Sequence, residues 1–152
     1  MTRPFLFILI MISYISFGRQ TVTPPEAPAV LKGNLRVIVK NFKSDKGQTN
    51  IVLYNDPKTF PDKPGSAPHN IWAKINKGMA DVTFEDIPYG DYALTAYHDE
   101  NDNHKLDLSF IGIPQEGIAV SNDARGFILP RFKDAKVILN IPNKTTVMSI
   151  VY

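Results

Sequence analysis

The densest group of oxygen-bearing side chains in the sequence is the stretch HDENDNHKLD, residues 98–107. Calcium is a hard cation that takes about six to eight oxygen ligands, and a tight loop with alternating Asp and Asn wraps such ligands around it. Oxygen donors recur here at every second position. They are Asp99, Asn101, Asn103, the Lys105 carbonyl and Asp107. The spacing predicts a Ca²⁺ site with these five residues as ligands.

Counted from Asp99, the stretch matches the EF-hand calcium loop at positions one, three, five, seven and nine. Position six, where Gly makes a sharp turn, is His104, and position twelve, where a bidentate Glu belongs, is Phe110. Another acid, such as Glu116, is needed to complete the ligand set, so the expected affinity is weak, about 10⁻⁴–10⁻³ M. The alternative is a structural turn, in which the Asp and Asn side chains accept hydrogen bonds from nearby backbone amides.

Nucleophilic catalysis is the alternative class of function. It would make the protein a small periplasmic hydrolase that uses Ser109 or Ser121 in the segment 99–134. Two histidines and an aspartate lie near these serines in the sequence, but no nucleophile-elbow pattern surrounds either one. We therefore expect no catalytic residues, and the leading expectation is a non-enzymatic binding or interaction module for an envelope or extracellular ligand or protein.

Two further sets of residues have chemical alternatives. His69, His98 and His104 are candidate zinc ligands, although their spacing follows no zinc motif. Trp72 and Tyr97 offer rings that stack on sugars, or that simply pack on a sheet. No cofactor is expected apart from Ca²⁺.

The elements that position these residues have a period of two, which is typical of half-buried strands. Turn sequences separate the strands, and no window carries a sustained helical stripe of apolar residues. The pattern predicts an all-β fold, an antiparallel β-sandwich of about seven strands. We expect three hairpins, one with its turn at residues 76–78. The predicted strands cover residues 35–40, 50–54, 71–75, 80–84, 91–99, 136–141 and 147–151.

The N-terminus has the pattern of a secretory signal peptide over residues 1–18. Arg3 precedes an apolar run that is well short of the roughly 20 residues of a spanning helix, and small residues precede a cut after Gly18. Residues 19–29 form a Pro-rich leader, and residues 30–152 form a single domain. We expect an exported protein, periplasmic or secreted, with no membrane span after cleavage.

Composition excludes several classes of protein. The sequence contains no cysteine, which excludes a disulfide framework, thiolate metal sites and a lipid-modified N-terminal Cys. The net charge of +2, from 17 basic and 15 acidic residues, provides no basic surface for nucleic acid.

Five ordered segments resemble the domain-of-unknown-function family 2141 of exported bacterial proteins. They lie at residues 88–92, 98–107, 112–117, 121–124 and 130–135, within a resemblance that covers residues 31–152. The resemblance implies a prealbumin-like, transthyretin-like sandwich, and the family has no settled activity. Members often have Gly where this chain has Asp102 and His104, which counts against carrying over a metal site.

Overall fold

The computed structural model describes residues 29–126 and 129–152. The predicted signal peptide, 1–18, and nearly all of the predicted leader lie outside these ranges. The described residues form eight strands and one short helix. They are β1 (Lys32–Lys40), β2 (Gln48–Tyr54), β3 (His69–Lys74), β4 (Met79–Pro88), β5 (Gly90–Asp99), β6 (Ile118–Val120), α1 (Phe132–Ala135), β7 (Val137–Leu139) and β8 (Asn143–Ser149), with 3-10 turns at Pro64–Ser66 and Ser121–Asp123. No helix among the described residues is long and apolar enough to cross a membrane.

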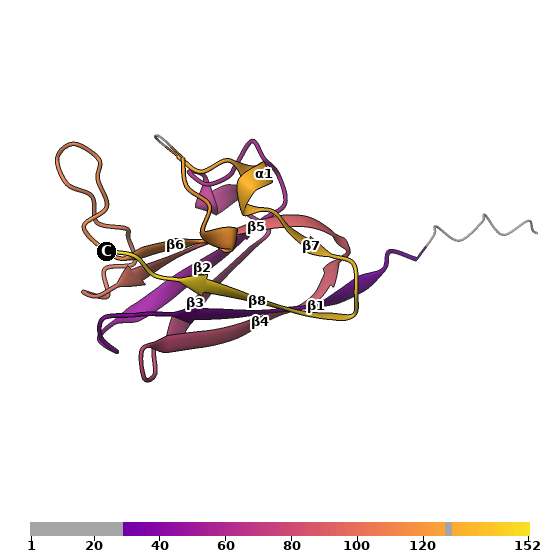
Figure 1. Ribbon diagram of the computed structural model, residues 1–152, viewed down its shortest axis with the longest axis horizontal. Coiled ribbons are helices and arrows are strands. Elements are labelled where there is room, and N and C mark those ends of the chain that lie inside the picture. Colours follow the sequence, from indigo (N-terminus) through magenta and orange to yellow (C-terminus); the bar gives the residue numbers. More distant parts are fainter. Residues whose placement is uncertain (1–28, 127–128) are drawn as a thin grey trace, which may run out of the picture.

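The strands form two sheets (Figure 1). One has the order β4-β1-β8, and the other has the order β3-β2-β5-β6, with β7 pairing to the beginning of β5. The expected mostly β fold is confirmed, with eight strands in place of about seven. The expected purely antiparallel pairing is wrong, because β8 runs parallel to β1 from Asn34 opposite Asn143 to Lys40 opposite Ser149. After β7 the chain crosses to the other sheet, and this crossover sets the direction of β8.

The three expected hairpins are also wrong as sheet pairings. Strands β1 and β2 belong to different sheets, as do β3 and β4, and β7 and β8. The turn at residues 76–78 does form, because Lys77 and Gly78 both have positive φ and Asn76 exchanges two backbone hydrogen bonds with Met79. The turn chemistry is local, whereas the choice of partner strand depends on burying an apolar face of each sheet against the other.

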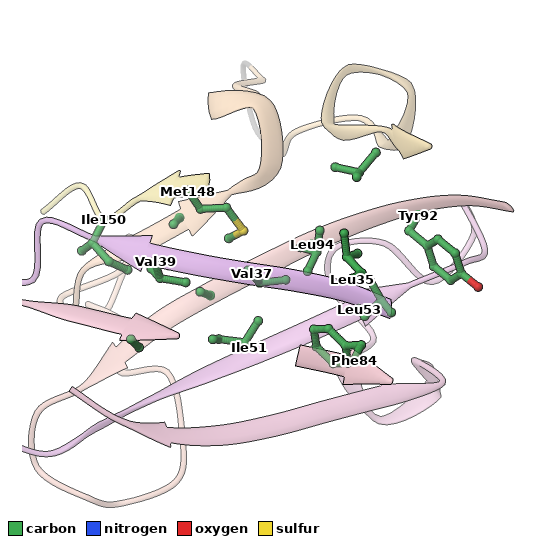
Figure 2. Close-up of a cluster of buried hydrophobic side chains, with 14 of the residues drawn as sticks. Leu35, Val37, Val39, Ile51, Leu53, Phe84, Tyr92, Leu94, Met148 and Ile150 are labelled. Carbon is green, nitrogen blue, oxygen red and sulfur yellow. The ribbon is translucent and has the colours of Figure 1, made fainter. Parts of the chain in front are cut away.

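The main core lies between the two sheets (Figure 2). Leu35, Val37 and Val39 point inward from β1 and are fully buried, as their alternate spacing predicts. They meet Leu53 of β2 and Leu94 of β5 from the facing sheet. The side chains of β5 alternate in the same way between the core and the outer face of the sheet. The outward-facing ones reach the candidate site.

A second, smaller cluster covers the outer face of the five-stranded sheet. Val52 and Tyr54 of β2 belong to it with Phe60. Tyr54 packs edge-to-face on Phe60 and donates its hydroxyl to the Pro61 carbonyl at 2.8 Å. Phe132 of α1 packs edge-to-face on Phe60 with ring centroids 5.8 Å apart. The five-stranded sheet is therefore buried on both faces at this end, and the pocket described below lies on the same outer face.

Candidate functional site

The loop at residues 99–107 begins at the last residue of β5. Asp99 is fully buried, and its carboxylate accepts the backbone N–H groups of Asn103 at 3.1 Å and His104 at 2.9 Å. The side-chain oxygen of Asn101 accepts the Asn103 N–H, and that of Asn103 accepts the Lys105 N–H. The structural turn considered as an alternative is thus present, and it is built by the predicted ligands.

Asp107 draws these side chains together. Its carboxylate accepts the Asn101 amide at 2.7 Å and the Asn103 amide at 3.0 Å. Lys105 enters the network through its backbone N–H, while its carbonyl oxygen accepts no hydrogen bond within the described part of the chain. Asn101, Asn103 and Asp107 are therefore linked side chain to side chain, and Asp99 joins them through the Asn103 backbone N–H.

Glu116 lies at the same loop, although 17 residues after Asp99. It is 7% exposed, and its two carboxylate oxygens accept the backbone N–H groups of Glu100 and Asp107, each at 3.1 Å. Glu116 therefore joins the beginning of the loop to its end. Residues 29–126 and 129–152 contain no group of three or more His, Asp or Glu side chains arranged to hold a metal ion, so Ca²⁺ binding here needs amide and carbonyl oxygens as well.

Two residues of the loop adopt the left-handed backbone conformation that favours glycine. Asp102 has φ 56° and His104 has φ 61°. His104 thereby makes the turn that Gly makes at the sixth EF-hand position, and its ring packs edge-to-face on Trp72 with centroids 4.6 Å apart. The resemblance implied Gly at both positions, and the positive φ values give the physical reason.

His98 faces the interior one residue before the loop and is fully buried. Its Nε2 lies 2.7 Å from the Lys46 carbonyl oxygen, and its Nδ1 lies 2.6 Å from the Tyr152 hydroxyl. Because a carbonyl only accepts, we assign the proton to Nε2, and the Tyr152 hydroxyl then donates to Nδ1. Both nitrogens are thus engaged, and His69, His98 and His104 do not form a set of zinc ligands.

The two candidate nucleophiles make hydrogen bonds to the backbone. The buried Ser121 hydroxyl accepts the Leu94 N–H at 3.0 Å and donates to the Ala135 carbonyl. The Ser109 hydroxyl accepts the Ile113 N–H at 3.0 Å. Among the described residues, neither serine is hydrogen-bonded to a histidine.

A pocket of about 490 Å³ lies on the outer face of the five-stranded sheet. Sheet residues, including Thr95, Tyr97 and Val120, line it, as do loop residues before β3, after β5 and before α1. Its walls are mainly apolar, and Asp62 is the one charged side chain among the described residues that line it. This volume falls within the usual range for small-molecule sites. An adjacent pocket of about 390 Å³ shares part of the lining, including Val120.

Tyr97 lines this pocket. From the sequence, its ring and that of Trp72 are candidates for stacking on sugars. The two rings are packed edge-to-face, with centroids 5.7 Å apart. Burial, reinforced by the negative charges of Asp99 and Glu116, raises the pKa of Tyr97 to about 12. Its hydroxyl makes no hydrogen bond to any residue that the structure describes, so it is a neutral group free to bond a ligand.

The comparisons with known proteins agree with the motifs. The family model described as "Uncharacterized protein conserved in bacteria (DUF2141)" matches residues 37–147, well over half of the chain. No curated protein and no solved structure matches the chain. The chain, with its 99–107 loop and its pocket on the five-stranded sheet, therefore belongs to the DUF2141 family of bacterial proteins.

Proposed function

We propose that this protein is an exported, non-enzymatic binding module with a prealbumin-like β-sandwich fold. In this proposal, its ligand is a small, mainly apolar molecule that occupies the 490 Å³ pocket on the outer face of the five-stranded sheet. The observation that carries the proposal is an apolar pocket of ligand size, lined in part by Tyr97, whose neutral hydroxyl makes no hydrogen bond to the described residues.

The charges around the pocket narrow the class of ligand. Asp62 lines the pocket, and Asp99 and Glu116 lie near enough to raise the pKa of Tyr97. No basic side chain among the described residues lines this pocket to balance them. An anion would therefore be repelled, and the preferred ligand is a neutral apolar molecule with a hydroxyl or carbonyl group that bonds to Tyr97.

A neutral fluorescent probe, N-phenylnaphthylamine, tests the proposal. We expect its emission to rise and saturate on binding one site. Val120→Phe fills the pocket from β6 and abolishes this signal, whereas the matched Val147→Phe on β8, outside the pocket, leaves it unchanged. An equal signal in both variants, or no saturable signal at all, contradicts a ligand site in this pocket.

Export rests on the signal pattern of residues 1–18. If the protein is exported, mass spectrometry of envelope or culture fractions finds a chain that begins near Arg19. A chain that retains Met1 in the membrane pellet contradicts export with cleavage.

Calcium binding at the 99–107 loop is a second candidate activity. The predicted ligands Asp99, Asn101, Asn103, the Lys105 carbonyl and Asp107 lie in one hydrogen-bonded loop, and Glu116 bonds to the same loop. Their oxygens are donors of the kind that Ca²⁺ prefers. Bound Ca²⁺ would neutralise part of this negative charge and hold the loop to β5. The carboxylates accept internal hydrogen bonds that a cation must displace, which supports weak affinity, about 10⁻⁴–10⁻³ M.

The rival function remains a small hydrolase acting through the segment 99–134. Generic ester, glycoside and peptide substrates separate the two functions. Turnover that Ser109→Ala or Ser121→Ala abolishes would overturn the proposal of a non-enzymatic module.

A further inference from the structure

A short apolar hairpin, residues 108–113, stands out from the body of the domain between β5 and β6 (Figure 1). Four of its six residues are large, exposed hydrophobics. They are Leu108, 53% exposed, Phe110, 106%, Ile111, 76%, and Ile113, 58%. Phe110 is the most exposed large hydrophobic side chain in the described part of the molecule. We call residues 108–113 the apolar tip.

The apolar tip is an ordered turn. The Ser109 N–H donates to the Ile113 carbonyl at 2.7 Å, and the Gly112 N–H donates to the Ser109 carbonyl at 2.9 Å. Ser109 also uses its hydroxyl to accept the Ile113 N–H, and Gly112 takes a φ of 81°, which suits glycine. Three of the six backbone N–H groups of the tip, those of Ser109, Gly112 and Ile113, are satisfied within the turn. Only the other three need hydrogen bonds from headgroups or interfacial water when the tip leaves bulk water.

The charge distribution makes this part of the molecule amphipathic. Residues 108–114 contain no charged side chain, whereas residues 98–107 and Glu116, which flank them, contain five acids and one Lys. Of these acids, Asp99 and Glu116 are buried and Glu100 pairs with Lys43 at 2.6 Å. The exposed Asp102 and the half-buried Asp107 are therefore the acids that face solvent behind the apolar end. This arrangement suits a surface that accepts apolar side chains and is not itself strongly negative.

Shape favours a lipid surface over a protein surface. A stable protein interface buries about 800 Å² on each partner and requires a matching surface, whereas one protruding turn offers a small, convex contact. A bilayer interface deforms around such a shape, and burial of exposed apolar area alone drives the insertion.

We infer that the apolar tip inserts into the interfacial region of a bilayer with zwitterionic headgroups, with Phe110 and Ile111 entering deepest. Asp102 and Asp107 stay in the aqueous phase and oppose docking on anionic lipid. This activity is separable from the proposed pocket ligand. Leu108 and Gly112 of the tip line the pocket, but Phe110 and Ile111, which enter deepest, do not.

Cosedimentation with phosphatidylcholine vesicles in the presence of a chelator tests this inference, with all variants carrying the same N-terminus as the protein recovered from exporting cells. We expect the Phe110→Ser/Ile111→Ser variant to partition at least about tenfold more weakly than the wild type. The matched control, Ile138→Ser/Val147→Ser, replaces two half-exposed apolar residues on β7 and β8 and keeps wild-type binding. Unchanged melting temperatures exclude unfolding as the cause.

Two further measurements sharpen the result. Phe110→Trp adds fluorescence that brominated lipid quenches if the tip is inserted, and replacing part of the phosphatidylcholine with phosphatidylglycerol weakens binding. Absence of vesicle binding, equal binding by the tip and control variants, or stronger binding to the anionic vesicles overturns the inference. A Phe110-dependent dimer in size-exclusion chromatography without vesicles also overturns it, and assigns the tip to a second copy of the chain.

Discussion

The Nδ1 atom of His98 lies 2.6 Å from the hydroxyl oxygen of Tyr152, which joins the last inward-facing residue of β5 to the final residue of the sequence. The same hydroxyl oxygen accepts the Lys43 N–H at 3.1 Å, and His98 also bonds to the Lys46 carbonyl. The end of β5 is therefore fixed from two sides, immediately before Asp99. The first predicted ligand of the loop thus extends from a rigid strand end.

Removing this hydroxyl should destabilise the fold. Tyr152→Phe leaves the buried His98 Nδ1 and the Lys43 N–H without their partner, so we expect the free energy of unfolding to fall by about 1–3 kcal/mol. Urea denaturation measures this change. Tyr89→Phe is the matched control, because the Tyr89 hydroxyl makes no hydrogen bond among the described residues. Equal stability of the two variants would show that the His98–Tyr152 bond contributes nothing.

Calcium should raise the melting temperature modestly. At millimolar Ca²⁺ and the expected affinity, mass action stabilises the fold by about 0.4–1.4 kcal/mol. Asp107→Asn, which keeps the shape of the side chain and removes its charge, abolishes this shift, whereas Asp91→Asn on β5 away from the loop preserves it. Calorimetry with Ca²⁺ and with chelator measures both. If no binding heat appears, the loop is only a structural turn.

Glycine at position 102 should stabilise the loop. Asp102 has a positive φ, and relief of this backbone conformation by Asp102→Gly is worth about 1 kcal/mol in the free energy of unfolding. His104→Gly gains less, because it also loses the ring contact with Trp72. Asp91→Gly within β5 is expected to destabilise, since glycine weakens a strand interior. Thermal or urea unfolding of the three variants checks the order.

Tyr97 should make stability fall at high pH. Its pKa is raised to about 12 in the folded state, while an unfolded tyrosine titrates near 10. The folded state therefore holds this proton more tightly, so the contribution is complete below about pH 10 and is lost as pH rises toward 12. Ultraviolet absorbance of the phenolate follows the titration, and Tyr97→Phe removes the component that ionises last. A Tyr97 that ionises near pH 10 would contradict the desolvation of its hydroxyl by partial burial.

Local patterns predicted the strands and part of the site. The alternation at Leu35, Val37 and Val39 identifies the inward face of β1, and the sequence HDENDNHKLD locates the loop with its linked Asp and Asn residues. Sheet membership was not predictable in the same way, because the parallel pairing of β1 with β8 joins residues 109 positions apart, such as Asn34 and Asn143. A turn sequence does not specify which strand becomes the neighbour.

The site residues that were missed depend on contacts between distant segments. The role of His98 depends on Tyr152, 54 residues later, and no local spacing connects the two. Several separate segments line the pocket, including those of Pro61, Leu108 and Pro130. The sequence of each segment, considered by itself, is that of an ordinary loop. Only the assembled fold brings them over the outer face of β5.

Backbone amide chemical-shift mapping of isotope-labelled protein, titrated with N-phenylnaphthylamine, shows directly where a ligand binds. Ligand binding in the pocket predicts saturable shifts at Val52, Thr95 and Val120 on the outer face of the five-stranded sheet, and in residues 106–114. The three-stranded sheet, which lies behind the main core, stays unperturbed. Shifts confined to β4, β1 and β8, or no saturable shift anywhere, would contradict the proposal that this domain is a binding module acting through that pocket.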